Sequence, residues 1–209
     1  MRIYLLIFSF LFALSLSAQT AFKAAKDTNA LKQKIDKMSK QTNTLESDFV
    51  QTKNLSALSD KIISKGHFCF QKQNLLRWEY FSPYLYTIVI NKDKMLIKDG
   101  KKVKKYDINS NKVFKEINDV MISCVNGDIL KSNKFKISYF ENDKFYKLEL
   151  VPISKGMKES LKKIVLYFDK NVSSVVKLDM IEPTGDNTLI EFSNKKINAI
   201  IPPEKFTLK

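Results

Sequence analysis

Two hydrophobic periods follow one another along the chain, and the first is helical. In residues 24–45 the apolar side chains of Leu31, Ile35, Met38 and Leu45 recur at steps of four, three and seven residues, with lysines on the other face. This spacing places one apolar stripe along an α-helix. The pattern therefore predicts one amphipathic helix ahead of the strands.

The second period is that of β-strands. Beyond the helix, short segments rich in β-branched and aromatic residues alternate with polar turns, which is typical of strands joined as hairpins. Antiparallel pairing is therefore the dominant prediction. The predicted strands are residues 45–53, 61–71, 75–81, 84–90, 94–100, 135–140, 144–150, 163–169, 174–181 and 188–192.

A second helix interrupts the run of strands. In residues 111–127 the side chains of Phe114, Ile117 and Met121 fall on one helical face, and Gly127 is a suitable helix stop. Residues 156–163 are expected to add a helical turn.

These elements predict an α+β fold with one long antiparallel sheet and helices over one face. A sheet of about ten strands tends to curl or split, so we expect strong curvature and a concave face that the helices cover. The chain shows no internal repeat and no low-complexity tract, and we expect a single domain.

The N-terminus has the pattern of an export signal. Arg2 precedes an apolar run from Ile3 to Leu14, and small residues follow up to Ala18. The run is shorter than the roughly 20 residues that a membrane span needs. We therefore predict a cleaved signal peptide over residues 1–18, a domain over residues 19–209, and a soluble exported protein.

The net charge of +14 rests almost wholly on lysine. Proteins that read nucleic acid favour arginine, whose planar fork binds in a bidentate way, and an exported protein meets little nucleic acid. We expect no nucleic-acid partner. A solvated lysine-rich surface is the first interpretation, and weak attraction to anionic lipid headgroups is the second.

Catalytic chemistry is poorly represented. His67 is the single histidine, which excludes metal clusters built on several histidines, and no phosphate-binding or nucleophile motif occurs. We predict no enzyme activity, no catalytic residue, no metal and no cofactor. Cys69 and Cys124 leave two alternatives open, a disulfide or a buried thiol.

Aromatic residues are concentrated on the strands. If residues 61–81 form a hairpin without a bulge, strand alternation puts Phe68 and Phe70 on the same face as Leu76, Trp78 and Tyr80. Such a face is either ordinary core or the lining of a ligand cavity, and periodicity does not separate the two. Arg77 points to the other face beside Glu79, where we expect it to pair with a neighbouring strand.

The ordered motifs resemble the periplasmic outer-membrane lipoprotein carriers, the LolA-like proteins. After the first helix come LESDFVQT (45–52), GHFCF (66–70) and LLRWEYFSP (75–83), each similar to a family strand. Residues 164–198 resemble the closing hairpins, and KFTL (205–208) resembles the last family strand. The series spans most of the chain that follows the signal peptide.

The resemblance implies a half-open β-barrel of about eleven strands, lidded by helices, whose cavity holds the acyl chains of a lipoprotein. It implies a monomeric periplasmic carrier whose partners are acylated lipoproteins, an inner-membrane lipoprotein-releasing transporter and an outer-membrane acceptor. The expected lipid-binding residues are Phe49, Phe68, Phe70, Leu76, Trp78, Tyr80 and Ile88. The expected lid residues are Leu31, Ile35, Met38, Phe114, Ile117 and Met121.

Two departures from the family pattern change the expectations. Family members commonly carry Arg–Pro before the tryptophan strand, and that arginine hydrogen-bonds the lid; the matching residues here are Lys72 and Gln73. We expect Lys72 to act as a looser latch because it lacks the guanidinium fork. Well-studied members also continue beyond the position of Lys209, so specificity for triacylated cargo is left open.

Two other functions remain as alternatives on the same fold. One is a lipid-sensing regulatory module, and the other is a carrier of a lipid or a lipid-linked metabolite.

Overall fold

A computed structural model of the protein describes residues 21–107, 120, 122–123, 128–171 and 174–208. These residues form one antiparallel sheet of twelve strands in the order β1-β8-β9-β10-β11-β12-β2-β3-β4-β5-β6-β7. The strands are β1 (Lys23–Ala24), β2 (Thr44–Asn54), β3 (Ile62–Gln71), β4 (Leu75–Ser82), β5 (Tyr86–Asn91), β6 (Lys94–Asp99), β7 (Lys102–Asp107), β8 (Phe135–Glu141), β9 (Phe145–Pro152), β10 (Lys163–Asp169), β11 (Val175–Ile181) and β12 (Asn187–Ile197).

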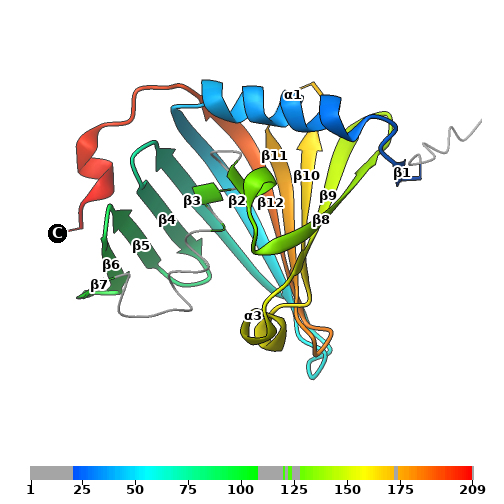
Figure 1. The fold of residues 1–209 in the computed structure, drawn as a ribbon. Coiled ribbons are helices and arrows are strands. Elements are labelled where there is room, and N and C mark those ends of the chain that lie inside the picture. The colour runs from blue at the N-terminus through cyan, green and yellow to red at the C-terminus, as the bar shows by residue number, and fades with distance from the viewer. Residues whose placement is uncertain (1–20, 108–119, 121, 124–127, 172–173, 209) are drawn as a thin grey trace, which may run out of the picture.

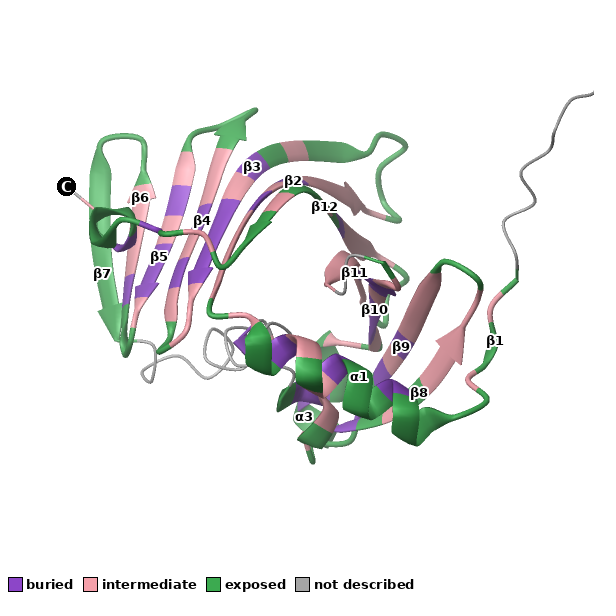
Figure 2. Cartoon of the chain, turned by 90° about the horizontal axis from the view of Figure 1, so that it is seen from above, coloured by how far each residue is buried: buried purple, intermediate pink, exposed green. Residues whose placement is uncertain are grey.

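The sheet is strongly curved and stays open. Its edge strands β1 and β7 do not pair with each other, and the strands follow an arc when seen from above (Figure 2). The helix α1 (Thr28–Gln41) crosses the concave side of this arc (Figure 1). The predicted fold class, an incomplete antiparallel barrel with helical cover, is confirmed, with twelve strands in place of about eleven.

Helix α1 is shorter than its hydrophobic pattern predicts. Asp27 caps its start, because the carboxylate oxygen Oδ1 accepts hydrogen bonds from the amides of Asn29 and Ala30 at 3.0 and 2.9 Å. The helix ends at Gln41, and Leu45 already belongs to β2, where it pairs with Phe70 of β3. Strand pairing thus overrides the helical spacing at the C-terminal end of the predicted element.

The sequence prediction also misses short elements. The two-residue strand β1 and the edge strand β7 were not predicted, because neither carries an apolar alternation; every residue of β7 is exposed. The helical turn near residue 156 is present as α3 (Lys155–Ser160). A 3₁₀ turn, η2 (Asp128–Lys131), precedes β8.

The prediction that KFTL forms a last strand is wrong. Residues Pro203–Phe206 form a 3₁₀ turn, η3, which packs on β4 and β5 rather than extending the sheet. Pro202 and Pro203 have no amide hydrogen to donate to a strand ladder, and the Phe206 side chain turns into the outer face of the sheet, where it is buried.

The second predicted helix lies mostly outside the described residues. Val120, Ile122 and Ser123 are helical, whereas Phe114, Ile117 and Met121 are not among the described residues, and neither is Cys124. Cys69 is a buried free cysteine. The predicted signal peptide also lies outside the described part of the chain. Within the described part, no helix is long and apolar enough to span a membrane.

Two hydrophobic clusters lie on opposite sides of the sheet. The large one fills the concave side and joins α1 to residues of most strands. The small one lies on the convex side and consists of Cys69 and Val89 from the sheet with Ile201 and Phe206 from the C-terminal segment. Strands β3, β4 and β5 therefore have apolar cover on both faces.

Candidate functional site

The pairing register of β2 to β5 gathers aromatic residues into rows across the concave face. One row runs from Ser47 through Phe68 and Trp78 to Ile88. The β3–β4 hairpin keeps its register between Gly66 and Gln71, so the continuous face that the sequence predicts for this hairpin is present.

A second row runs from Phe49 through Gly66 and Tyr80 to Tyr86. The ring of Phe49 lies over Gly66: a Cβ at Gly66 would stand 2.3 Å from the Phe49 Cζ atom and 2.1 Å from the Glu79 carbonyl oxygen. A glycine is therefore required for the Phe49 ring to lie flat in the row.

The rings of the two rows contact one another. The centroid of Phe49 lies 4.6 Å from that of Trp78 and 5.1 Å from that of Tyr80, and Phe68 meets Trp78 edge-on at 5.1 Å. Phe192 of β12 adds a further edge contact to Trp78 at 6.2 Å. These are favourable aromatic geometries, and Trp78 lies at their centre.

Helix α1 covers this aromatic face. Leu31 and Ile35 are buried in the same cluster as Phe49, Phe68 and Trp78, and Met38 packs against it. The concave face is thus filled by side chains in this structure. The sequence left open whether this face is core or the lining of a cavity. In this structure it is core, and it would line a cavity only if α1 moved away.

A hollow continues from one end of the aromatic face. It encloses about 350 Å³ and is lined by Tyr80, Tyr86 and Ile88 together with Ser64 and the β4–β5 turn. In that turn Tyr84 and Leu85 are 80% and 70% exposed. The Tyr80 hydroxyl donates to Gln51 Oε1 at 2.9 Å, and burial raises the pKa of Tyr80 and that of Tyr86.

Two polar atoms of the concave face are buried without a hydrogen-bond partner among the described residues. They are the indole nitrogen Nε1 of Trp78 and the hydroxyl oxygen Oγ of Ser47. Both residues lie in the same cross-strand row, with Phe68 between them. Buried groups of this kind are usually paired, and each unmet hydrogen bond costs about 1–3 kcal/mol.

The C-terminal end of α1 is held by two side chains from distant parts of the chain. Lys72 Nζ donates to the Lys40 carbonyl oxygen at 2.7 Å, and Asn198 Nδ2 donates to the Gln41 carbonyl oxygen at 2.8 Å. The last carbonyl groups of a helix have no partner within the helix, so both contacts satisfy groups that α1 leaves open.

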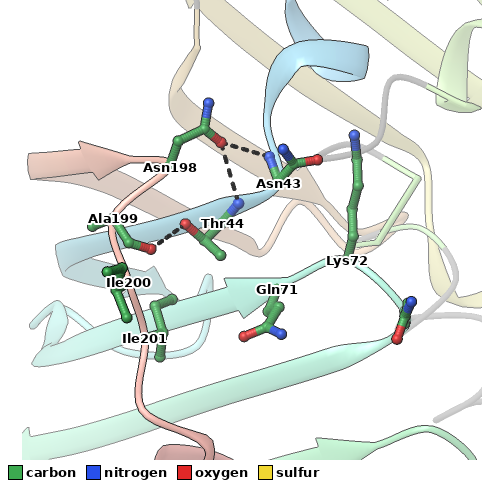
Figure 3. A pocket seen from close by; sticks show the side chains of 9 residues that line it. Asn43, Thr44, Gln71, Lys72, Asn198, Ala199, Ile200 and Ile201 are labelled. Carbon is green, nitrogen blue, oxygen red and sulfur yellow. Dashed lines mark hydrogen bonds between the residues drawn. The ribbon is translucent and has the colours of Figure 1, made fainter.

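Asn198 also binds the start of β2. Its Oδ1 accepts from the amides of Asn43 and Thr44 at 2.7 and 3.5 Å, as Figure 3 shows. Asn198 adopts a positive φ of 58°, a conformation that asparagine tolerates well. A hollow of about 450 Å³ lies beside these contacts, with Lys72 and Asn198 among its lining residues.

Arg77, the single arginine among the described residues, makes its contacts on the convex face. Arg77 forms a bidentate pair with Glu79 on its own strand, with N···O distances of 2.8 and 2.9 Å. It also donates to the carbonyl oxygens of Lys205 and Thr207 at 3.3 and 3.5 Å. The expectation that Arg77 pairs with a neighbouring strand is wrong: its partners lie two positions along the same strand and in the C-terminal segment.

The predicted site residues fall into three groups. The structure places Phe49, Phe68, Phe70, Leu76 and Trp78 in the concave cluster, with Tyr80 and Ile88 packed against it. Leu31, Ile35 and Met38 of the predicted lid lie on α1 above them. Lys72 contacts the helix that it was predicted to latch. Their roles in binding remain predictions.

Sequence reasoning did not find Asn198 or Ser47. Asn198 lies 157 positions from Gln41, and a surface asparagine after a strand carries no signal of such a contact. Ser47 alternates with Leu45 and Phe49 in β2, so its inward position could have been read from the strand period.

The structure therefore has the fold of a half-open β-barrel whose apolar concave face is covered by an amphipathic helix. The sequence profile of the family described as "Outer membrane lipoprotein carrier protein LolA" matches residues 40–209. The chain belongs to this family.

Relatives at low identity carry the same name. An outer-membrane lipoprotein carrier protein of Chromobacterium violaceum is 26% identical over 169 residues, which cover 79% of this chain and 76% of that protein. One of Pseudomonas putida is 24% identical over 202 residues, with 93% and 89% covered.

Among the solved structures that are similar in fold to this chain are MucB and a protein from Thermus thermophilus. MucB matches with a TM-score of 0.53 and 10% identity, over 86% of this chain and 62% of MucB. An uncharacterized conserved protein from Thermus thermophilus matches with a TM-score of 0.53 and 9% identity, over 86% of this chain and 94% of that chain. At such identity they support the architecture alone.

Proposed function

We propose that the protein carries acylated lipoproteins through the periplasm by sheltering their acyl chains on the concave face beneath α1. The observation that carries the proposal is the aromatic face of β2 to β5, covered by a helix whose C-terminal end is held by two side-chain hydrogen bonds. We propose binding and transfer as the activity, with no catalytic step.

The physical need for a carrier follows from the cost of exposing an acyl chain. At about 0.8 kcal/mol per CH₂ group, a 16-carbon chain costs on the order of 12 kcal/mol to bring into water. Cargo must therefore pass directly from one apolar environment to another. The membrane partners of this exchange would be a lipoprotein-releasing transporter on the inner membrane and an acceptor on the outer membrane.

The concave face accepts cargo by exchanging contacts. Leu31 and Ile35 of α1 occupy the face in this structure, and an acyl chain that replaces them provides equivalent apolar contact. The free-energy difference between closed and loaded states is then small, which permits both uptake and release. The hollow lined by Tyr80, Tyr86 and Ile88 offers a place for one end of the chain.

The unpaired polar atoms favour cargo with hydrogen-bond acceptors over plain hydrocarbon. The indole N–H of Trp78 and the hydroxyl of Ser47 are both able to donate to an ester or amide carbonyl. Acyl chains attached to a lipoprotein carry such carbonyls at their head. Each hydrogen bond formed there would remove a cost of about 1–3 kcal/mol that the closed state bears.

Trp78 provides a direct test because it is the only tryptophan of the chain. A fatty-acyl glyceride brominated along its chain should quench Trp78 fluorescence in a saturable way, whereas the unbrominated lipid should not. Binding of the brominated lipid without quenching would place the acyl site elsewhere and contradict the proposal.

The cargo itself is identified by purifying the protein from the native periplasm and analysing what co-elutes by mass spectrometry. Acylated lipoprotein is the expected result. A free lipid or lipid-linked metabolite would favour the metabolite carrier, and empty protein bound to a membrane regulator would favour the sensory module. A depletion strain in which lipoproteins still reach the outer membrane would exclude the carrier function.

A further inference from the structure

The convex face of β2 and β3 carries a group of polar side chains that the carrier function does not use. Glu46 pairs with Cys69 across the two strands, and Asp48 pairs with His67. Strand alternation places all four on the side opposite Phe49 and Phe68. One ligand atom each from Glu46, His67 and Cys69 lies within 4.8 Å of the other two.

A carboxylate oxygen, an imidazole nitrogen and a thiolate sulfur are the three ligand types that Zn²⁺ takes from proteins, at about 2.0–2.3 Å. Ligand atoms around one tetrahedral ion are then roughly 3.5 Å apart. The Cys69 sulfur and Glu46 Oε1 are 3.8 Å apart, joined by a weak hydrogen bond. The other two separations are at most 4.8 Å, so the ligand atoms would have to approach one another by up to about 1 Å to share one ion.

Asp48 completes the arrangement as an orienting group. Its Oδ1 lies 2.9 Å from His67 Nδ1, and its Oδ2 accepts from Asn194 Nδ2 at 2.8 Å. A carboxylate oxygen at this distance from Nδ1 accepts the ring proton there, which leaves Nε2 as the nitrogen that can bind a metal.

The proposed ligands differ in their exposure to solvent. The His67 side chain is 32% exposed, whereas Cys69 is fully buried, so the imidazole forms the mouth of the site and the sulfur its base. The ion binds the thiolate form of Cys69, so the thiol proton leaves when the ion binds.

We propose that Glu46, His67 and Cys69 form a binding site for a single zinc-like divalent ion, with Asp48 as the residue that positions the imidazole. Three protein ligands leave the fourth position to water. The ion joins β2 to β3 on the convex face, opposite the aromatic face, and is a structural tie between the two strands. This inference is independent of the carrier function.

The test is a Co²⁺ titration of a Cys124→Ser background, in which Cys69 is the one remaining thiol. We expect a cobalt–thiolate charge-transfer band in the near ultraviolet that saturates at one equivalent and disappears when Zn²⁺ is added. Saturating Zn²⁺ should also raise the thermal unfolding midpoint. Absence of the band would overturn the proposal.

Variants assign the ligands. Cys69→Ser should abolish the band, and His67→Gln should weaken Co²⁺ binding about tenfold or more. Because His67 is partly exposed, His67→Gln is expected to fold. It therefore tests the site even if the buried substitution Cys69→Ser prevents folding. Asp48→Asn should weaken binding about 10–100-fold. Glu159→Gln, on an exposed position of α3, is the matched control. A band unaffected by His67→Gln would also overturn the site.

Discussion

The two faces of strands β2 to β5 differ in what covers them. The concave face packs aromatic rings against α1, a helix joined to this region by a few hydrogen bonds at its end. The convex face packs Cys69 and Val89 against the C-terminal segment, which Arg77 binds through two carbonyl groups.

This difference suggests that α1 can be replaced on the concave face, whereas the C-terminal segment stays bound to the convex face. The concave contacts beneath α1 are apolar and non-directional, so another apolar body can replace them, at the cost of the two hydrogen bonds that hold the C-terminal end of α1. The convex contacts include charged and directional hydrogen bonds, which a lipid cannot reproduce. Cargo exchange is therefore expected on the concave side while the convex side keeps the sheet in shape.

The largest expected effect comes from removing one buried phenylalanine on each face. Phe49 and Phe206 are both about 1% exposed. Phe49→Ala should lower the free energy of unfolding by about 3–5 kcal/mol. Phe206→Ala should lower it less, because the C-terminal segment can detach while the sheet stays paired.

Urea unfolding measures both variants, and amide hydrogen exchange locates the change. Phe206→Ala should speed exchange in residues 198–206 and leave α1 unaffected. Equal loss of global stability in the two variants would show that the convex cover is as much part of the core as the concave one.

Next in size is the substitution of Gly66 by alanine. The added Cβ would meet the Phe49 ring and the Glu79 carbonyl oxygen, and overpacking of this kind costs about 1–3 kcal/mol. Gly156→Ala is the control: nothing lies within 4 Å of its added Cβ, and alanine in α3 should gain up to about 1 kcal/mol. Thermal unfolding compares the two, and a neutral Gly66→Ala would contradict the close packing of Phe49 on the strand.

A smaller effect is expected at the end of α1. Lys72→Met removes one hydrogen bond to a helix carbonyl group and should cost about 1 kcal/mol. Asn198→Ala also removes the hydrogen bonds from the amides of Asn43 and Thr44 and should cost more than Lys72→Met. Both should speed amide exchange in the last turn of α1 and the uptake of an acyl probe. Lys37→Met, on an exposed position of α1, is the control. If Lys72→Met leaves uptake unchanged, Lys72 is no latch.

The smallest effect concerns the acid response of the convex face. The hydrogen bond from Arg77 holds the pKa of Glu79 below its ordinary value of 4.5. A lowered carboxyl pKa adds stability that is present above the ordinary value and is lost as the pH falls through the folded-state pKa. In Glu79→Gln, the free energy of unfolding should therefore fall less steeply than in the wild type as the pH drops below about 4.5. Urea unfolding at a series of pH values measures this. The same pH dependence in both proteins would show that Glu79 does not have this role.

Much of the fold follows from local pattern. The strand period predicted ten of the twelve strands, and the alternation in β3 and β4 placed Phe68, Phe70, Leu76, Trp78 and Tyr80 on one face, because a strand's side chains alternate whatever its neighbours are. The failures lie where long-range contact decides: α1 ends four residues early because β2 begins at Thr44.

The candidate sites divide in the same way. The sequence alone determined the apolar row, the amphipathic helix and the outward direction of Arg77, since each depends on residue spacing within one element. Only the tertiary structure decided that Asn198 joins Lys72 at the end of α1, that η3 covers Val89, and that Glu46 and Cys69 stand side by side. Those contacts depend on which strands pair and in what register, and no local pattern specifies that.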